Sequence, residues 1–180
     1  MADVSVRPTV PAEAPELARI QAAVWSQVHS ASLPADLLEA VGSAEAAEQW
    51  RAAVAAPPSA RHRVMTALAE DTVVGFAAVV PAADPDLDPA VDAELMALYV
   101  DPRATGAGHG SRLVNAAVDL ARDAGFTAVH VCTAEAETDL RGFLAGAGWA
   151  ADGATRELDL RGDGEVLVTQ TRLGASLSEP

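Results

Sequence analysis

The sequence contains no lysine, one cysteine and few aromatic residues. All 12 basic residues are arginines, and they are scattered singly, whereas proteins that bind nucleic acid need clustered basic side chains to neutralise phosphates. Cys132 has no second cysteine to pair with, so the sequence excludes an intrachain disulfide and a cysteine-based zinc site. No apolar run reaches the roughly 18–20 residues that a membrane span requires, and residues 1–7 lack the features of a signal peptide. We therefore expect a cytoplasmic protein that binds neither nucleic acid nor a membrane.

The composition otherwise describes an acidic protein with enough apolar residues for a core. The chain has 180 residues, the length of one ordinary domain, and 50% of them are hydrophobic, which excludes disorder over most of the chain. The formal net charge is −14 at pH 7. An acidic field attracts cations such as free amines, but solubility alone also explains a charge of this size.

Apolar spacing predicts helices in the first third of the chain and strands in the middle. Three helices are expected to begin near Glu16, Leu33 and Ser43, with Ser43 as the N-cap of the third. The strand-like runs are residues 63–69, 72–80 and 93–100, the first two joined by a turn at Glu70-Asp71.

The second half of the chain alternates between strands and helices. A glycine-rich turn follows the third strand and leads into a helix that Gly125 closes. The elements predicted next are a strand at 127–132, a short helix at 139–145, and a hairpin of 158–160 with 166–171. Residues 174–180 are predicted to form a loose tail, so the domain is expected to span residues 1–173.

The most informative segment is the turn between a strand and a helix within residues 94–114. Gly106, Gly108 and Gly110 alternate there, and without side chains the backbone can direct its N–H groups toward one point and let a ligand approach closely. The following helix adds unpaired N–H donors and the positive end of its dipole. The segment therefore predicts an anion site, for which phosphate is the commonest ligand.

Two common phosphate motifs do not fit this segment. A P-loop requires Gly-Lys-Ser/Thr, and the chain has no lysine. A dinucleotide fingerprint has the spacing G-x-G-x-x-G and normally lies in the first βαβ unit, whereas the spacing here is G-x-G-x-G, past the middle of the chain. A glycine-rich turn without a ligand is the remaining alternative, although three alternating glycines are costly in conformational entropy.

The same segment resembles motif A of the GNAT superfamily of N-acetyltransferases. The resemblance rests on Leu98–Pro102, on Thr105–Ser111 and on the helix end Asp123–Phe126, and residues 143–149 are similar to the family's later F-Y-x-x-x-G-F segment. The order of the elements is similar to the family over nearly the whole chain. The resemblance implies a single α/β domain with a mixed central sheet and helices on both faces, in which splayed strands at Val100 and Val131 form a cleft.

In this family motif A, usually Q/R-x-x-G-x-G/A, holds the CoA pyrophosphate on backbone amides. The resemblance therefore implies acetyl-CoA as co-substrate and no metal. Its implied contacts are Leu98, Tyr99, Val100, Thr105, Gly106, Ala107, Gly108, His109, Gly110 and Ser111. Two registers fit: Arg103-x-x-Gly106-x-Gly108 satisfies the pattern literally, whereas a register in which Gly110 leads into the helix places Thr105 where the family has Arg or Gln. We favour the second register.

The resemblance also implies direct transfer of the acetyl group to a primary amine, either a small cationic amine or an amino group of a protein, and it leaves a homodimer open. Glu94 corresponds to a Glu that deprotonates the amine through water in many members, while a strand-end carboxylate facing solvent is the alternative reading. A backbone N–H at Leu98 or Tyr99 would stabilise charge on the thioester oxygen, and the main chain through Val100 would pair with the pantetheine arm.

The proton donor to the departing thiolate is where the sequence differs from the family. The usual donor is the Tyr of F-Y-x-x-x-G-F, and Leu144 stands at that position; Glu137 falls near the place of an Asn that commonly opens the same helix. Tyr99 is a candidate substitute, although the thiolate can also leave without a dedicated donor. Because leucine cannot donate a proton, a catalytically degenerate CoA-binding sensor or partner protein is the competing hypothesis.

The remaining titratable residues carry weaker signals. His109, in the glycine turn, is predicted to add positive charge near phosphate, and His130, within a strand, to be structural. None of the four histidines has a partner at metal-ligand spacing. Cys132 lacks a nearby basic residue that would activate it as a nucleophile. Trp25 and Trp50 are predicted to be core residues near the acceptor side.

Overall fold

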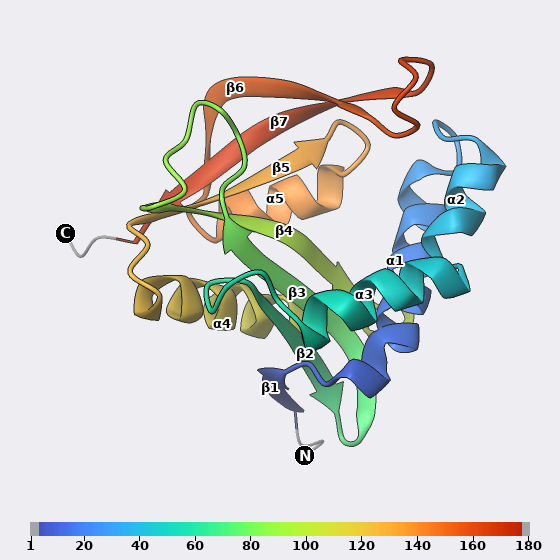
Figure 1. The fold of residues 1–180 in the computed structure, drawn as a ribbon, viewed down its shortest axis with the longest axis horizontal. Helices are drawn as coiled ribbons and strands as arrows, with labels where there is room; N and C mark the ends of the chain where they lie inside the picture. Colours follow the sequence, from blue (N-terminus) through green and yellow to red (C-terminus); the bar gives the residue numbers. More distant parts are fainter. Residues whose placement is uncertain (1–3, 178–180) are drawn as a thin grey trace.

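Across residues 4–177, the part of the chain that the computed structural model describes, seven strands form one mixed sheet with helices on both faces (Figure 1). The strands are β1 (Val4–Pro8), β2 (Arg63–Ala69), β3 (Thr72–Pro81), β4 (Asp92–Val100), β5 (Ala128–Ala134), β6 (Ala150–Asp159) and β7 (Leu167–Ser176). The helices are α1 (Ala14–His29), α2 (Ala35–Val41), α3 (Ala44–Ala55), α4 (His109–Asp123) and α5 (Thr138–Gly146), with short 3-10 turns η1 (Pro11–Glu13) and η2 (Pro102–Ala104). The predicted α/β class with a mixed sheet is confirmed.

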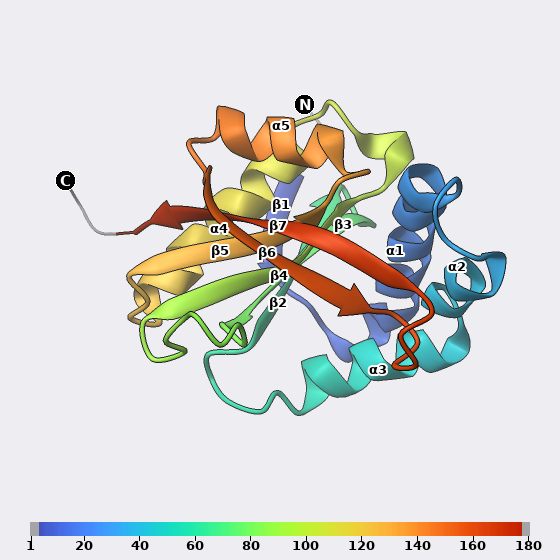
Figure 2. The same ribbon diagram turned by 90° about the horizontal axis from the view of Figure 1, so that it is seen from above.

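Each face of the sheet carries its own hydrophobic core. The helices α4 and α5 lie on one side of the sheet, and α3 lies on the other, next to α1 (Figure 2). On the α4 side, Leu113 and Leu144 are fully buried and pack with Leu95 of β4. On the α1 side, Leu17 packs with Phe76 of β3, and both side chains are fully buried. The two cores fix the sheet between the helices, so the strand ends keep a defined position for a site.

Several local signals act as the sequence predicts. Ser43 caps α3, its hydroxyl accepting a hydrogen bond from the N–H of Ala46 at 3.2 Å. Gly125 ends α4 with a φ of +81°, and Phe126 N–H donates to the carbonyl of Ala121, which is the Schellman arrangement. Glu70 adopts a φ of +56° in the tight turn between β2 and β3. These caps and turns place the element boundaries close to the predicted ones.

The strands β4 and β5 separate as they leave their common end. Among the described residues they form the one parallel pair, and their pairing covers only Asp92–Glu94 with Ala128–His130. Beyond Glu94, β4 stays paired with β3 on its other edge as far as Val100, while β5 continues beside β7. The edge of β4 that faces β5 therefore lacks a strand partner from Leu95 onward, and this separation is the predicted splay.

The prediction for the C-terminal segment was wrong for residues 174–177. Strand β7 continues to Ser176, because Gly174 and Ala175 pair with His130 and Val129 of β5. Leu177 is 5% exposed, and its N–H donates to the carbonyl of Thr127 at 2.8 Å. The sequence did not predict this end of the strand, because its residues are small or polar and show no apolar alternation. Backbone pairing with β5 holds it in the sheet. Residues 178–180 lie outside the described part of the chain.

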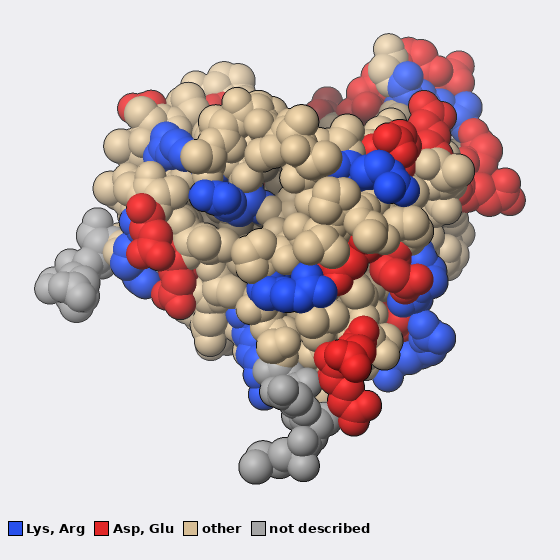
Figure 3. Space-filling model, turned by 60° about the horizontal axis from the view of Figure 1, so that its bottom comes forward, with Lys and Arg blue, Asp and Glu red and all other residues tan. Residues whose placement is uncertain are grey.

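The surface carries charges of both signs. On the face drawn in Figure 3, arginines and carboxylates are interspersed, and large areas between them are uncharged. Within the described residues, no helix is long and apolar enough to span a membrane.

Candidate functional site

The glycine-rich turn between η2 and α4 has the geometry that the sequence predicts. Gly106 and Gly108 have φ angles of +79° and +81°, in the left-handed region that favours glycine. Gly108 is the N-cap of α4, so the first N–H groups of this helix lie directly beside the turn and have no helical acceptors. The turn therefore presents backbone donors and the positive end of a helix dipole at one place.

A cavity of about 510 Å³, here called the cofactor cavity, lies between this turn, the free edge of β4 and α5. Among its lining residues are Leu98, Tyr99, Val100, Thr105, Gly106, Gly108, His109, Gly110 and Ser111. Ala107 is the one predicted contact that does not line it, and its carbonyl accepts a hydrogen bond from Arg112 Nη1 at 3.0 Å. Asp139, Leu140 and Phe143 of α5 also line it, together with Val24 and Ala104. No sequence pattern pointed to Asp139 or Leu140 as contacts.

Asp101 ties the start of the turn to the rest of the domain. Its carboxylate is 4% exposed and accepts hydrogen bonds from the backbone N–H and the guanidinium of Arg103, at 2.9 and 2.8 Å. Arg19 of α1 donates to the same carboxylate at 2.9 Å. These donors, Arg103 above all, hold the pKa of Asp101 well below its usual range. The charge of Arg103 is thus already paired on the rim of the site.

His109 is buried within the turn. The residue is 4% exposed, and burial, followed by the neighbouring charge of Arg112, lowers its pKa. Both effects disfavour the charged imidazole and so act against the positive charge predicted for His109 near phosphate.

Tyr99 lines the cofactor cavity, and its ring packs against Phe76 of the core on the α1 side of the sheet. Its hydroxyl accepts a hydrogen bond from Trp25 Nε1 at 3.1 Å, and burial raises its pKa to about 12. The phenol therefore stays protonated at ordinary pH and holds its proton more tightly than a free tyrosine. This environment suits a hydrogen-bond donor better than a group that gives up a proton in each turnover.

The position predicted to face the thiolate belongs to the core instead. Leu144 is fully buried and packs in the cluster on the α4 side of the sheet. The preceding residue, Phe143, lines the cofactor cavity, and its ring tip lies 3.6 Å from where a Cβ on Gly110 would be. Phenylalanine has no proton to donate either. Among the described residues of α5, Phe143 is thus the aromatic one that lines the cofactor cavity. Leu144 instead packs in the core, which corrects the expectation that its position faces the thiolate.

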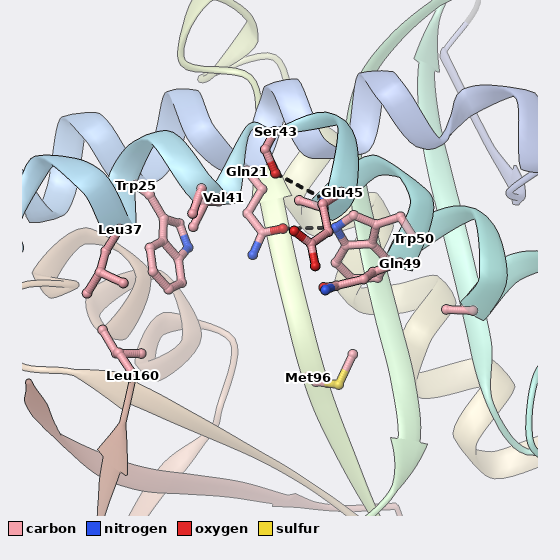
Figure 4. A pocket seen from close by; sticks show the side chains of 13 residues that line it. Gln21, Trp25, Leu37, Val41, Ser43, Glu45, Gln49, Trp50, Met96 and Leu160 are labelled. Carbon is pink, nitrogen blue, oxygen red and sulfur yellow. Dashed lines mark hydrogen bonds between the residues drawn. The ribbon is translucent and has the colours of Figure 1, made fainter. Parts of the chain in front are cut away.

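Two adjoining cavities of about 350 and 540 Å³ lie beyond Tyr99 and together form what we call the acceptor cleft. They share five lining residues, Gln21, Trp25, Trp50, Met96 and Leu160. Figure 4 shows the larger one, which lies between α1, α2, α3, β4 and the end of β6. Tyr99 lines both the smaller cavity and the cofactor cavity. The cofactor cavity and the acceptor cleft therefore meet at this residue.

Glu94 lies in the acceptor cleft, buried at 7% exposure. Its alternative reading as a carboxylate facing solvent is therefore wrong, and its role as a base stays a prediction. Its Oε1 accepts a hydrogen bond from Arg156 Nη2 of β6 at 3.0 Å, and Gln170 Oε1 of β7 accepts from Arg156 Nε at 2.8 Å. The sequence did not single out Arg156, because β6 is distant along the chain and reaches the site only through the sheet order.

Glu137 is a second carboxylate at the site, on the N-terminal side of α5. Its side chain is 15% exposed and lines both the acceptor cleft and a small cavity that also contacts Leu98. Its Oε2 accepts a hydrogen bond from the N–H of Ala134 at 2.6 Å, and its Oε1 lies 4.0 Å from His29 Nε2. Burial raises the pKa of Glu137. Its sequence signal was its place near the Asn that commonly opens this helix in the resembling family.

Cys132 also lines the acceptor cleft, and burial raises the pKa of its thiol. A protonated thiol is a poor nucleophile, which agrees with the expectation from sequence. Among residues 4–177, no three His, Cys, Asp or Glu side chains converge in a way that could hold a metal ion.

The family follows from comparison with known proteins. Residues 24–149 match the acetyltransferase (GNAT) family, and this match covers more than half of the chain. The chain belongs to the GNAT family. A search of curated protein sequences found no match.

Solved structures with the same fold cover nearly the whole chain. PaiA N-acetyltransferase of Thermoplasma acidophilum, in complex with coenzyme A, has a TM-score of 0.76 at 15% identity over 97% of this chain and 99% of its own. A GCN5-related N-acetyltransferase from Rhodopseudomonas palustris has 0.73 at 22% identity over 98% and 97%. YncA of Salmonella typhimurium, solved with acetyl-CoA, has 0.70 at 16% identity over 99% and 96%. At these low identities, the structural similarity supports the fold of this GNAT domain.

Proposed function

We propose that this GNAT protein transfers an acetyl group from acetyl-CoA directly to a primary amine. The observation that carries the proposal is the meeting of two cavities at Tyr99: one is lined by the glycine turn of the family motif, and the other contains buried carboxylates. Coenzyme A and acetyl-CoA, named for the PaiA and YncA structures, support the choice of acyl donor.

The chain's own groups suit the parts of this reaction. The N–H groups of the turn from Thr105 to Ser111 would hold the pyrophosphate, as helix N-termini commonly do. The free edge of β4 would pair with the pantetheine arm in the manner of an added strand. A backbone N–H at Leu98 or Tyr99 would then donate to the thioester oxygen as it gains negative charge.

The transfer itself forms one bond, breaks another and moves two protons. The amine nitrogen forms a bond to the carbonyl carbon, and one of its protons passes to a base in the acceptor cleft. The carbon–sulfur bond then breaks, and the thiolate takes a proton from solvent, since Leu144 is buried in the core and Phe143 carries no transferable proton. A thiolate is a tolerable leaving group near neutral pH, because thiols have pKa values of about 8.5.

A CoA-binding sensor is the second candidate, and the lack of a tyrosine at Leu144 or Phe143 is the observation that favours it. Two measurements separate the candidates. Acetyl-CoA should raise the melting temperature well above the effect of NAD or ATP at equal concentration, because only a ligand selective for the folded state stabilises it. Thiol release from acetyl-CoA should then depend on added amine. Stabilisation without amine-dependent thiol release across a broad panel would support the sensor.

A further inference from the structure

The acceptor cleft combines polar groups with a shared apolar surface. Next to Tyr99, Glu137 contacts both the cleft and the small cavity beside Leu98. Trp50, Met96 and Leu160 line both cavities of the cleft, and the larger cavity is also lined by the polar residues Gln21, Ser43, Glu45 and Gln49. An acceptor that reacts beside Tyr99 therefore extends over the apolar surface that the two cavities share.

The indole N–H groups of both tryptophans in the cleft already donate hydrogen bonds within the protein. Trp25 Nε1 donates to the Tyr99 hydroxyl at 3.1 Å, and Trp50 Nε1 donates to Gln21 Oε1 at 2.9 Å. Each indole therefore offers a ligand only apolar ring surface. Trp50 is in addition held by edge-to-face packing on Phe76, with ring centroids 5.0 Å apart. These walls are rigid and recognise shape and apolar area rather than hydrogen-bonding groups.

Met96 extends this apolar surface on the floor of the cleft. It points from β4 toward α3 (Figure 4), and it is 52% exposed although it is a large apolar side chain. Leu160 lies across the cleft from Leu37, so apolar side chains face one another from the hairpin and from α2. An exposed apolar residue inside a cavity of ligand size indicates surface that a ligand covers.

Three carboxylates line the acceptor cleft: Glu45 lies in the larger cavity, and Glu94 and Glu137 lie in the smaller one that also contacts Tyr99. The last two are not equivalent. One oxygen of Glu94 is occupied by Arg156, and Glu94 lies four residues before Leu98, which is about 13 Å along a strand. Within the part of the chain that the structure describes, no donor forms a hydrogen bond to Glu137 Oε1, and Glu137 shares a cavity with Leu98 and Tyr99. The titratable and charged groups around Glu137 are His29 from α1, Tyr99 from β4 and Asp139 on its own helix, and Glu94, Cys132 and Arg156 line the same cavity from the sheet. Glu137 is thus the carboxylate nearer to the expected position of the thioester.

We propose that the acceptor is a small primary amine joined by a short chain to an apolar, ring-sized group, with the amine at Glu137 and the apolar group against Trp25, Trp50 and Met96. The assignment rests on the proposed acetyl transfer. The acceptor reacts as the neutral amine, after its ammonium form has released one proton to solvent. Glu137 Oε1 then receives the second proton, which the amine loses as the carbon–nitrogen bond forms, and the departing thiolate takes a proton from solvent. Glu94, held by Arg156, shapes the middle of the cleft.

The first test compares acceptors. 2-Phenylethylamine should give a kcat/KM about tenfold or more above that of ethanolamine, the scale expected for burying a ring-sized group. Its binding should also change the tryptophan fluorescence. Met96→Asp should remove most of this preference through KM, because the ring would then meet a carboxylate. Leu167→Asp is the matched control: Leu167 is 49% exposed on β7 and does not line the cleft, so it should leave the preference intact.

The second test concerns Glu137. Glu137→Gln should lower kcat/KM about 100-fold near neutral pH, the typical contribution of a positioned base, and the loss should shrink at high pH, where the amine is already neutral. Because burial raises the pKa of Glu137, the wild type loses stability as pH rises through that pKa, whereas the glutamine variant does not. Glu137→Gln should therefore be at least as stable as the wild type at pH 8, which a merely structural role would not produce. Glu94→Gln should cost less activity.

The following outcomes would overturn the acceptor assignment, the role of Glu137 or the proposed function. Preference for ethanolamine or for a peptide amine, or an unchanged KM in Met96→Asp, would overturn this assignment while leaving acetyl transfer in place. A larger loss in Glu94→Gln than in Glu137→Gln would overturn the role of Glu137. No transfer to any amine, with acetyl-CoA still bound, would overturn the proposed function and this assignment together.

Discussion

The cofactor side and the acceptor side of this GNAT domain are built by different means. The cofactor side consists mainly of backbone: a turn with Gly106 and Gly108 in left-handed conformations, a helix N-terminus and the free edge of β4. The acceptor side consists of side chains from the helices α1, α2 and α3 and from the strands β4, β5, β6 and β7. The first should therefore fail when the backbone is forced to change, and the second when a single side chain changes its chemistry.

The largest effect is expected from Gly108→Val. Its φ of +81° disfavours any residue with a Cβ, and a Cβ there would lie 3.0 Å from Arg112 Nη1. We expect acetyl-CoA affinity to fall about 10- to 100-fold, which corresponds to the strain of a non-glycine residue in such a conformation. Calorimetric titration with acetyl-CoA would measure this loss.

The matched control is Gly153→Val. Gly153 has a φ of +88° in β6 and open space around its Cβ position, so it carries the same backbone strain away from the cofactor cavity. Acetyl-CoA should still bind this variant normally. Equal losses in both variants would mean that global strain, rather than the turn, explains the effect.

This difference in construction also explains how far sequence could lead. Alternating glycines, the cap at Ser43 and the end of α4 at Gly125 are local signals, and the structure bears them out. Arg156 and Met96 reach the cleft only through strand order and pleat, which spacing along the chain does not encode. The lowered pKa of His109 depends on its burial, which its residue type alone does not reveal.

A smaller effect is expected from Asp101→Asn, which removes the charge that holds the turn to α1. The substitution should lower the free energy of unfolding by about 1.5–3 kcal/mol at pH 7, the range for hydrogen bonds to charged groups. Since the pKa of Asp101 is lowered in the folded state, its contribution is present above the unfolded pKa of about 3.9 and is lost as the pH falls. Urea unfolding should show a smaller difference in the free energy of unfolding between Asp101→Asn and the wild type at pH 3 than at pH 7.

Arg103→Ala provides the comparison for that experiment. The Arg103 side chain is 78% exposed, so its loss should lower stability much less than Asp101→Asn does, because solvent screens an exposed ion pair. A gap between Asp101→Asn and the wild type that stays constant from pH 7 to pH 3 would show that the carboxylate charge is not what stabilises the turn.

A comparable loss of stability, but in the core, is expected from Leu144→Tyr. Leu144 has no exposed surface, and enlarging a well-packed residue costs about 1–3 kcal/mol. Phe143→Tyr is the matched change on the cofactor side, where the added hydroxyl would enter the cavity, and it should leave the melting temperature nearly unchanged. Higher turnover in Leu144→Tyr without loss of stability would contradict the assignment of Phe143 as the cavity residue.

The smallest effect on turnover is expected from Tyr99→Phe. The change leaves the indole N–H of Trp25 without its acceptor, so stability should fall by about 1 kcal/mol. Because a phenol with a pKa of about 12 is a weak acid, most of the turnover should remain. A loss of about 100-fold with acetyl-CoA binding intact would instead identify Tyr99 as the proton donor.

The most direct test of the central claim is the stoichiometry of products by mass spectrometry. The protein is incubated with acetyl-CoA and 2-phenylethylamine, and the acetylated amine and free coenzyme A are quantified in the same sample. The account predicts the two products in equal amounts, accumulating over many turnovers and strongly reduced in Gly108→Val. Bound acetyl-CoA that is never consumed, with neither 2-phenylethylamine nor any other primary amine acetylated, would contradict it.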